Sequence, residues 1–273
     1  MDRYAGVDKF ADMLIPRGCV LCSTPMNTGA LLCKDCIPER LTGPLCPRCG
    51  KPERSCVCAP YSDDEWAARG MLGALAHRGK VRGTVLRLRR MPDHRLVRFF
   101  AQEMAMALER EYTGAFAEVA GRSDVRDLPK FDIITEVPRH VEKLERRGFN
   151  QAELLAGALA PMVGAAHRMR ILACLREQSV AVSGHQKFAA AQESYALQIP
   201  IVAGKDVLLI DDVLDTGATA NACAAHLLGG GAASVFVLTA TTTVNNQRQE
   251  NSEQIYQEPG DTPVDLRDMI SGL

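Results

Sequence analysis

The chain has 273 residues, of which 47% are hydrophobic and 24% are charged, and its formal net charge is -1. This near-neutral charge excludes a general electrostatic attraction to nucleic acid, and the composition is typical of a folded globular protein with one large core and a small additional module. No apolar stretch reaches membrane-spanning length and nothing indicates export, so we expect a cytoplasmic protein with no membrane insertion.

A short helix is expected near the N-terminus. Apolar residues recur with helical spacing from Val7 to Ile15, and Pro16 ends the pattern. Eight of the ten cysteines then lie between Cys19 and Cys58. In a reducing compartment, such clustering predicts metal ligands rather than disulfides.

These eight cysteines form four pairs. Three pairs have two intervening residues, a spacing that presents two thiolates to one ion, and two such pairs complete a tetrahedron around zinc. The simplest arrangement is two structural zinc sites in sequence, although an interleaved arrangement also fits. The first site would use Cys19, Cys22, Cys33 and Cys36, and the second would use Cys46, Cys49, Cys56 and Cys58. The segment has few large apolar residues, so we expect metal to supply its folding energy.

A connector over Tyr61–Ala76 is expected to lead into the main domain. Between Arg78 and Arg98 there are eight Lys or Arg residues and a single acid, and the densest part is Arg87–Arg90. A solvated surface is the default interpretation of such a run, and a phosphate or nucleic-acid contact is the alternative. The residues Leu96–Tyr112 then show the apolar spacing of a helix.

A β-branched strand is predicted over Phe131–Pro138. Arg139 follows it directly, and Arg146 and Arg147 precede a predicted helix over Ala152–Val163. In parallel α/β sheets, ligands bind beyond the carboxyl ends of the strands. These three arginines are therefore candidates for contacting a polyanion, with a water-facing surface as the alternative.

The most informative stretch is Val207–Thr219. An apolar, strand-like run ends in Asp211 and Asp212, and a turn of small residues leads to a helix over Ala220–Leu228. Unpaired N–H groups and the dipole at a helix N-terminus favour an anion, so this turn is a candidate phosphate loop. Its residues are Asp215, Thr216, Gly217, Ala218 and Thr219.

The two acids lie close enough to that loop to accept hydrogen bonds from the hydroxyls of a bound sugar phosphate. The alternative is a surface acid pair before an N-capped helix. Two adjacent acids at the end of a buried strand are costly without a function, which favours the binding site.

Three glycines end the helix, and Ser234–Thr242 is a further strand. From Val244 to Leu273 there are two bases and six acids, which predicts a poorly ordered tail. Cys174 and Cys223 are expected to be buried packing residues. We therefore expect a cysteine-rich module over residues 1–60, an α/β domain with a mainly parallel sheet flanked by helices over 61–243, and a tail over 244–273.

The stretch Val207–Thr219 resembles the signature of the type I phosphoribosyltransferases. The resemblance implies that Asp211 and Asp212 hold the ribose hydroxyls of phosphoribosyl pyrophosphate (PRPP) and that the loop binds its 5′-phosphate. Mg²⁺ would accompany PRPP, and the three arginines would face its pyrophosphate. For Asp215 it implies a general acid/base acting on a purine-type acceptor, while a helix N-cap is the alternative.

Further motifs look like the ComF family, whose members join an N-terminal zinc ribbon to a phosphoribosyltransferase-like domain. They are Val137-Pro138, the run Arg147-Gly-Phe-Asn-Gln-Ala152, the downstream loop and the cysteine-rich N-terminus. The family resemblance implies a link to DNA uptake in natural transformation, and it allows a homodimer.

One segment departs from the family pattern. Family members usually carry Thr, Arg and Asn residues in a mobile hood over the ligand. Here Arg176–Gln186 keeps Gln186, with Ser183 in place of Thr, and Lys187–Ile199 lacks the Arg and Asn. Cations over the pyrophosphate would neutralise developing charge, so the sequence supports ligand binding and leaves catalysis open.

Two functions are therefore considered. The first is binding of PRPP or another 5′-phosphoribosyl compound, with phosphoribosyl transfer if the site is active. The alternative is a non-enzymatic zinc-ribbon adaptor that binds single-stranded DNA or a competence helicase, with Arg87, Arg89 and Arg90 supplying phosphate contacts.

Overall fold

The structure is a computed structural model. It describes residues 18–26, 29–41, 44–58, 66–113, 130–176 and 191–244. The helix predicted over Val7–Ile15, Ser183 and Gln186 of the hood and the tail from residue 245 onward lie outside these residues.

A five-stranded sheet forms the centre of the molecule, and every neighbouring pair of its strands is parallel. Its order is β1-β7-β6-β2-β3. The strands are β1 (Gly70–Ala76), β7 (Ser234–Thr242), β6 (Asp206–Leu214), β2 (Ile133–Glu136) and β3 (Ala166–His167). The predicted parallel α/β fold is confirmed.

The connector expected over Tyr61–Ala76 is wrong for its second half, which is strand β1. All seven residues of β1 are buried, and the strand pairs with β7. Two glycines weaken its strand pattern, but Gly73 is required by close packing. A Cβ atom at Gly73 would lie 2.6 Å from Cβ of Thr242.

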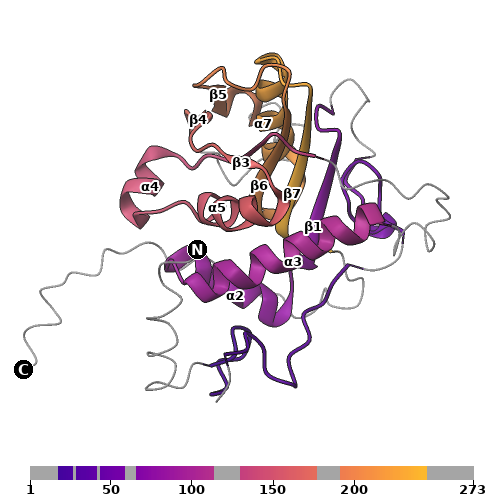
Figure 1. The fold of residues 1–273 in the computed structure, drawn as a ribbon, viewed down its shortest axis with the longest axis vertical. Helices are drawn as coiled ribbons and strands as arrows, with labels where there is room; N and C mark the ends of the chain where they lie inside the picture. The colour runs from indigo at the N-terminus through magenta and orange to yellow at the C-terminus, as the bar shows by residue number, and fades with distance from the viewer. Residues whose placement is uncertain are drawn as a thin grey trace, which may run out of the picture.

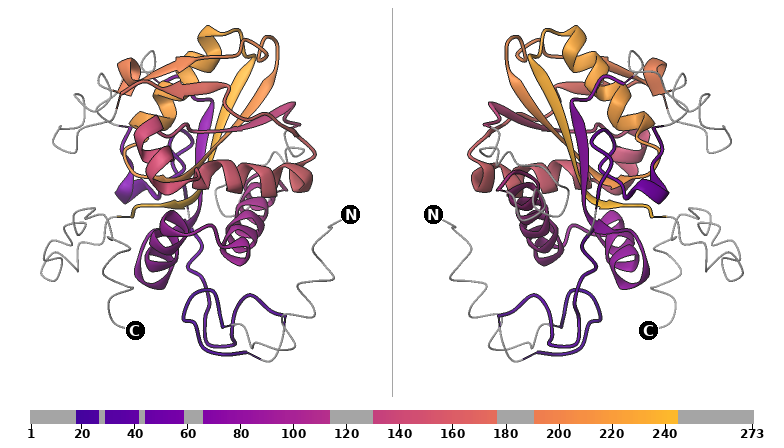
Figure 2. Two further views of the ribbon diagram at one scale, coloured as in Figure 1. Left: turned by 90° about the vertical axis from the view of Figure 1, so that its left-hand side faces the viewer. Right: turned by 90° about the vertical axis from the view of Figure 1, so that its right-hand side faces the viewer.

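Helices cover both faces of the sheet, as Figure 1 shows. The helices on one side are α2 (Gly79–Arg90), α3 (His94–Thr113) and α5 (Gln151–Val163), and α7 (Ala218–Gly229) lies on the other. The short helix α4 (Val141–Arg147) follows β2. Figure 2 shows the segment with the first cysteine pairs beyond α2 and α3, on the side away from the sheet.

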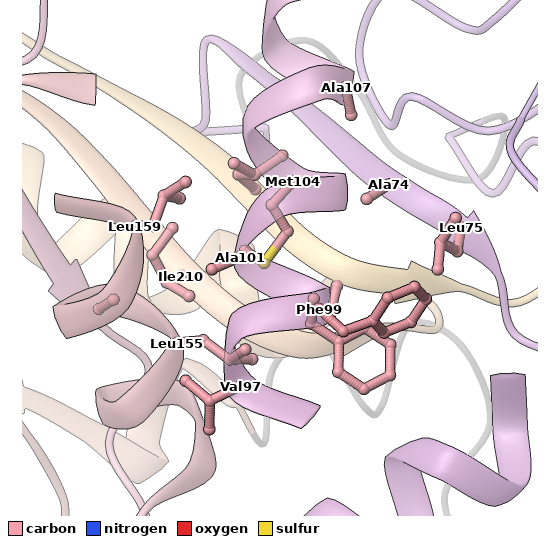
Figure 3. Close-up of a cluster of buried hydrophobic side chains, with 14 of the residues drawn as sticks. Ala74, Leu75, Val97, Phe99, Ala101, Met104, Ala107, Leu155, Leu159 and Ile210 are labelled. Atoms are coloured by element: carbon pink, nitrogen blue, oxygen red, sulfur yellow. The ribbon is translucent and has the colours of Figure 1, made fainter. Parts of the chain in front are cut away.

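Alternating side chains of the central strands build two apolar layers. On β6, Leu208 and Ile210 belong to the layer beneath α3 and α5, and Val207 and Leu209 belong to the layer beneath α7. Figure 3 shows the first layer, where Met104 of α3 lies among aliphatic side chains of α5 and β6. Both faces of β6 are therefore buried, as expected for the centre of a parallel sheet.

A second, antiparallel pair of strands lies beside α7 and consists of β4 (Leu172–Cys174) and β5 (Tyr195–Leu197). A short 3-10 helix, η1 (Glu53–Ser55), lies within the second group of cysteines. Across the described part of the chain, no helix combines the length and apolar character needed to span a bilayer.

Candidate functional site

The eight N-terminal cysteines form two separate clusters. Within each cluster, the four Sγ atoms lie within 4.8 Å of one another. The Sγ–Sγ distances include 3.7 Å for Cys22–Cys33 and 3.8 Å for Cys46–Cys58. A tetrahedral zinc site with Zn–S bonds of about 2.3 Å requires sulfur separations of about 3.8 Å. Both clusters therefore fit a structural zinc ion. The first holds Cys19, Cys22, Cys33 and Cys36, and the second holds Cys46, Cys49, Cys56 and Cys58, which is the sequential arrangement.

The first cluster packs against helix α2. The backbone oxygen of Val20 accepts hydrogen bonds from Arg87 Nη1 at 2.9 Å and from Thr84 Oγ1 at 3.3 Å. Nζ of Lys80 lies 3.4 Å from Sγ of Cys36. Part of the basic run therefore joins the cysteine module to the main domain, rather than forming a purely solvated surface.

A cavity of about 370 Å³ opens at the carboxyl ends of β2 and β6. The predicted acids Asp211 and Asp212 line it, but strand β6 continues through both of them to Leu214 instead of ending there. Helix α7 begins at Ala218, two residues before the predicted start, so only three residues separate the strand from the helix. The cavity is lined by Arg89, Val137, Pro138, Arg139, His140, Lys143, Arg147, Asn150, Gln151, Cys174, Tyr195, Asp211, Asp212, Val213 and Thr219.

The carboxylate of Asp212 is buried and held by two other side chains. Arg89 donates from Nε at 2.7 Å and from Nη2 at 2.9 Å, and Gln151 donates from Nε2 at 2.6 Å. Burial alone would raise the pKa of Asp212, but the charge and hydrogen bonds of Arg89 outweigh it and lower that pKa. Asp212 is therefore ionised, and its hydrogen bonds connect Arg89 of α2 with Gln151 of α5.

Asp211 has the opposite electrostatic environment. Its Oδ1 accepts a hydrogen bond from the backbone N–H of Asp212 at 2.8 Å. Burial, followed by the charge of Asp212, raises the pKa of Asp211 to about 7. Of the two acids, Asp211 is the one whose charge changes near neutral pH.

The predicted phosphate loop leads into α7, whose N-cap is Gly217 in the left-handed conformation with φ of 79°. Ala218 and Thr219 belong to the first turn of the helix, and Thr219 lines the cavity. Thr216 Oγ1 accepts a weak hydrogen bond from the N–H of Ala218 at 3.3 Å.

Asp215 is exposed and is not among the cavity-lining residues. The N-cap interpretation of Asp215 is wrong because Gly217 occupies the N-cap position. Instead, Asp215 accepts a hydrogen bond from Thr243 Oγ1 at 3.0 Å. Its predicted acid/base role stays a prediction.

Two of the three predicted arginines line the cavity. Arg139 and Arg147 do so, and Arg146 is exposed and does not. Burial and the charge of Arg147 lower the pKa of Arg139, and its guanidinium donates to Gln151 Oε1. The arginines at 146 and 147 form the last turn of α4 rather than a loop, and Gly148 ends that helix with φ of 77°.

Sequence reasoning missed Arg89 as a cavity residue and placed Cys174 wrongly. Arg89 was expected on a solvated surface, yet it follows Val81 and Val85 at intervals of four residues, both of which are buried on α2. That helical spacing places Arg89 on the inward face. Cys174 is partly exposed at the cavity, whereas Cys223 is buried as predicted.

Family models match both parts of the chain. The model for the double zinc ribbon domain matches residues 10–65, and the model for the phosphoribosyl transferase domain matches residues 144–262. The DNA utilization protein YhgH of Salmonella typhi is 28% identical over 244 residues, covering 82% of this chain and 96% of that protein. The competence protein ComFC of Bacillus subtilis is 29% identical over 206 residues, covering 74% and 79%. The chain belongs to the ComF family.

The ComF assignment confirms the family expected from the motifs and agrees with the two cysteine clusters and the parallel sheet. Among solved structures, this ComF protein is similar to the hypoxanthine phosphoribosyltransferase of Trypanosoma cruzi, complexed with the product IMP. That protein is 15% identical, the match covers 56% of this chain and 76% of that one, and the TM-score is 0.32.

Proposed function

We propose that the cavity binds a 5′-phosphoribosyl compound, with PRPP and Mg²⁺ as the combination that its residues suit best. The observation that carries the proposal is the meeting of acids and cations at one 370 Å³ cavity beside the N-terminus of α7. A sugar bearing phosphates needs carboxylates for its hydroxyls and N–H donors or cations for its phosphates.

Each part of the ligand has a matching group in this arrangement. Asp211 would accept a hydrogen bond from a ribose hydroxyl, and Asp212, held by Arg89, would fix the position of that strand end. Thr219 and the first turn of α7 would bind the 5′-phosphate, where the helix dipole favours an anion. Arg139 and Arg147 would face the pyrophosphate.

Catalysis of phosphoribosyl transfer is a further proposal. The anomeric carbon would form a bond to a nucleophilic atom of the acceptor as its bond to pyrophosphate breaks, pyrophosphate would leave, and bound Mg²⁺ would supply charge neutralisation for that leaving group. Among the described residues, Arg139 and Arg147 would add fixed positive charge at the same place. The names of the relatives place them in DNA utilization and competence, and we propose the same setting for this protein.

Calorimetry with PRPP and Mg²⁺ tests the binding proposal. The wild-type chain should bind, and Arg147→Ala should bind about tenfold or more weakly, because a charge-assisted contact to phosphate is lost. Arg146→Ala is the matched control, since it removes the same charge from the same helix turn but from outside the cavity. No heat with millimolar PRPP, or equal losses for both variants, would contradict the proposal.

The alternative DNA-binding proposal loses part of its basis. Of the three arginines assigned to phosphate contacts, Arg89 is engaged by Asp212 and Arg87 by the backbone of Val20. Replacing them would disturb the cavity and the cysteine module, so weaker DNA binding by such a variant would not identify a DNA contact. Arg90 is exposed and can be tested separately.

The affinity for PRPP should depend on pH through Asp211. A carboxylate that accepts a hydrogen bond from a ribose hydroxyl must be ionised, and the pKa of Asp211 is about 7. Binding should therefore weaken as the pH falls through 7, by about tenfold between pH 8 and pH 6. Because the phosphates of PRPP also titrate near pH 6, Asp211→Asn serves as the reference. Calorimetry at both pH values should show a smaller change for the variant, and an equal change would contradict the assignment.

A further inference from the structure

Lys51 is a buried cation next to the second cysteine cluster. It follows Cys49 by two residues, and 2% of its surface is exposed. Its Nζ donates to Thr243 Oγ1 at 2.7 Å and to the backbone oxygen of Thr243 at 3.1 Å. Burying an ammonium group is unfavourable without compensating partners, so its position is well defined.

Thr243 connects Lys51 to the phosphate loop. It directly follows strand β7, and its N–H donates to the backbone oxygen of Leu214 at 3.0 Å. Its Oγ1 accepts from Lys51 and donates to Asp215 Oδ1 at 3.0 Å, which uses the hydroxyl in both directions. The hydrogen bonds thus run from the cysteine module to the first residue of the loop.

A second contact joins the same two parts. The guanidinium of Arg48 lies over the ring of Trp66, 5.2 Å from its centroid. Trp66 also approaches Gly217, where a Cβ atom would lie 3.2 Å from Trp66 and 3.3 Å from Sδ of Met71. The N–H of Met71 donates in turn to the backbone oxygen of Arg48 at 2.8 Å. The cysteine module therefore packs behind the N-cap of α7.

Electrostatics favour the same arrangement. Four thiolates around one Zn²⁺ carry a net charge of about −2, and Asp215 brings a carboxylate to the same Thr243 hydroxyl that Lys51 binds. The ammonium group is thus close to two anionic groups, which compensate for its burial. Removing either anion would leave Lys51 less well compensated.

We propose that Lys51 is a positioning residue, through which the second metal site fixes the phosphate-binding loop. That the loop binds phosphate rests on the proposed function. The coupling between the second metal site and the position of the loop does not depend on it. A cysteine module of this size folds around its metal. Loss of zinc from the second cluster would therefore release Lys51 and Trp66 together and loosen Asp215–Gly217.

Lys51→Met in the full-length chain tests this coupling. The substitution keeps an unbranched side chain one atom shorter and removes its charge. Zinc content should stay at two ions per chain, matching the two clusters, while amide hydrogen exchange in residues 214–219 should become about tenfold faster. PRPP affinity should fall by about tenfold or more. Lys80→Met is the matched control, because it removes the same charge beside Cys36 of the first cluster instead of the second.

A second variant keeps the proposal testable if Lys51→Met does not fold. Thr243→Val removes the hydroxyl that joins Lys51 to Asp215, and it should produce the same faster exchange. Unchanged exchange in a folded, zinc-loaded Lys51→Met or Thr243→Val protein would overturn the proposal. If the wild-type chain does not bind PRPP, the proposed function fails, and hydrogen exchange still decides whether Lys51 positions the loop.

Discussion

Asp212→Ala is expected to lower the free energy of unfolding by about 3 kcal/mol, because the guanidinium of Arg89 loses the carboxylate that it binds inside the fold. The Asp212 side chain is 5% exposed and the Arg89 side chain is 31% exposed, which places the loss at the lower end for a buried pair. Urea unfolding at pH 8 measures the change. The substitution also removes the side chain that Arg89 and Gln151 hold beside Asp211 in the cavity. PRPP binding should therefore be lost as well.

Asp211→Asn provides the contrasting control at the neighbouring position. The folded-state pKa of Asp211 is raised from 3.8 to about 7, so its stabilising effect is present below pH 4 and is lost as the pH rises through 7. At pH 8 the ionised group is unfavourable, and removing its charge should leave stability unchanged or increase it. Equal destabilisation by both variants would contradict the different roles assigned to the two acids.

Removal of zinc should cause the second large effect. Apparent binding energies of structural zinc are on the order of 10 kcal/mol, and much of this energy is folding energy for modules without a core of their own. A strong chelator should therefore release two ions per chain, matching the two clusters, and lower the melting temperature. Metal release with a colorimetric chelator and parallel thermal unfolding measure both quantities.

The two metal sites should differ in their effect on the main domain. Cys49 is fully buried and belongs to the same apolar cluster as Trp66 and Met71, whereas Cys22 is only partly buried. Cys49→Ser should consequently lower the melting temperature of the main domain more than Cys22→Ser does. Cys174→Ser is the control, since Cys174 lies outside both clusters and should leave the zinc content unchanged. A loss of zinc from this control would contradict the assignment of ligands.

The sequence was sufficient where one local pattern decided the structure. Cysteine spacing predicted both cysteine clusters, and the apolar run before Asp211 predicted a buried strand. It was insufficient where a contact joins distant segments. Lys51 and Thr243 are 192 positions apart, and no local pattern pairs them. Strand β1 was missed because its glycines weaken the strand pattern, although Gly73 is needed for packing against Thr242.

The cavity residues also separate into those that a local sequence pattern predicted and those that depend on contacts between distant segments. The acids of the cavity and two of its arginines were predicted because the acids lie near the carboxyl end of one strand and the arginines follow another at the same edge of the sheet. Arg89 was missed because its charge suggested solvent, although its spacing from Val85 placed it on the buried face of α2. Gln151 was noted only as part of a family motif, and its hydrogen bond to Asp212 depends on how α5 packs on β6.

The strand order also has a consequence for how the chain folds. Strand β7 lies between β1 and β6, so β1 pairs residues as far apart as Gly70 and Phe236. During synthesis, β1 therefore has no partner in the sheet until the last strand has been made. Pairing over such long separations slows folding, while the preceding cysteine modules can close around metal from local contacts alone. Metal binding can thus precede completion of the sheet, and we expect a newly made chain to keep one apolar strand unpaired in the interval.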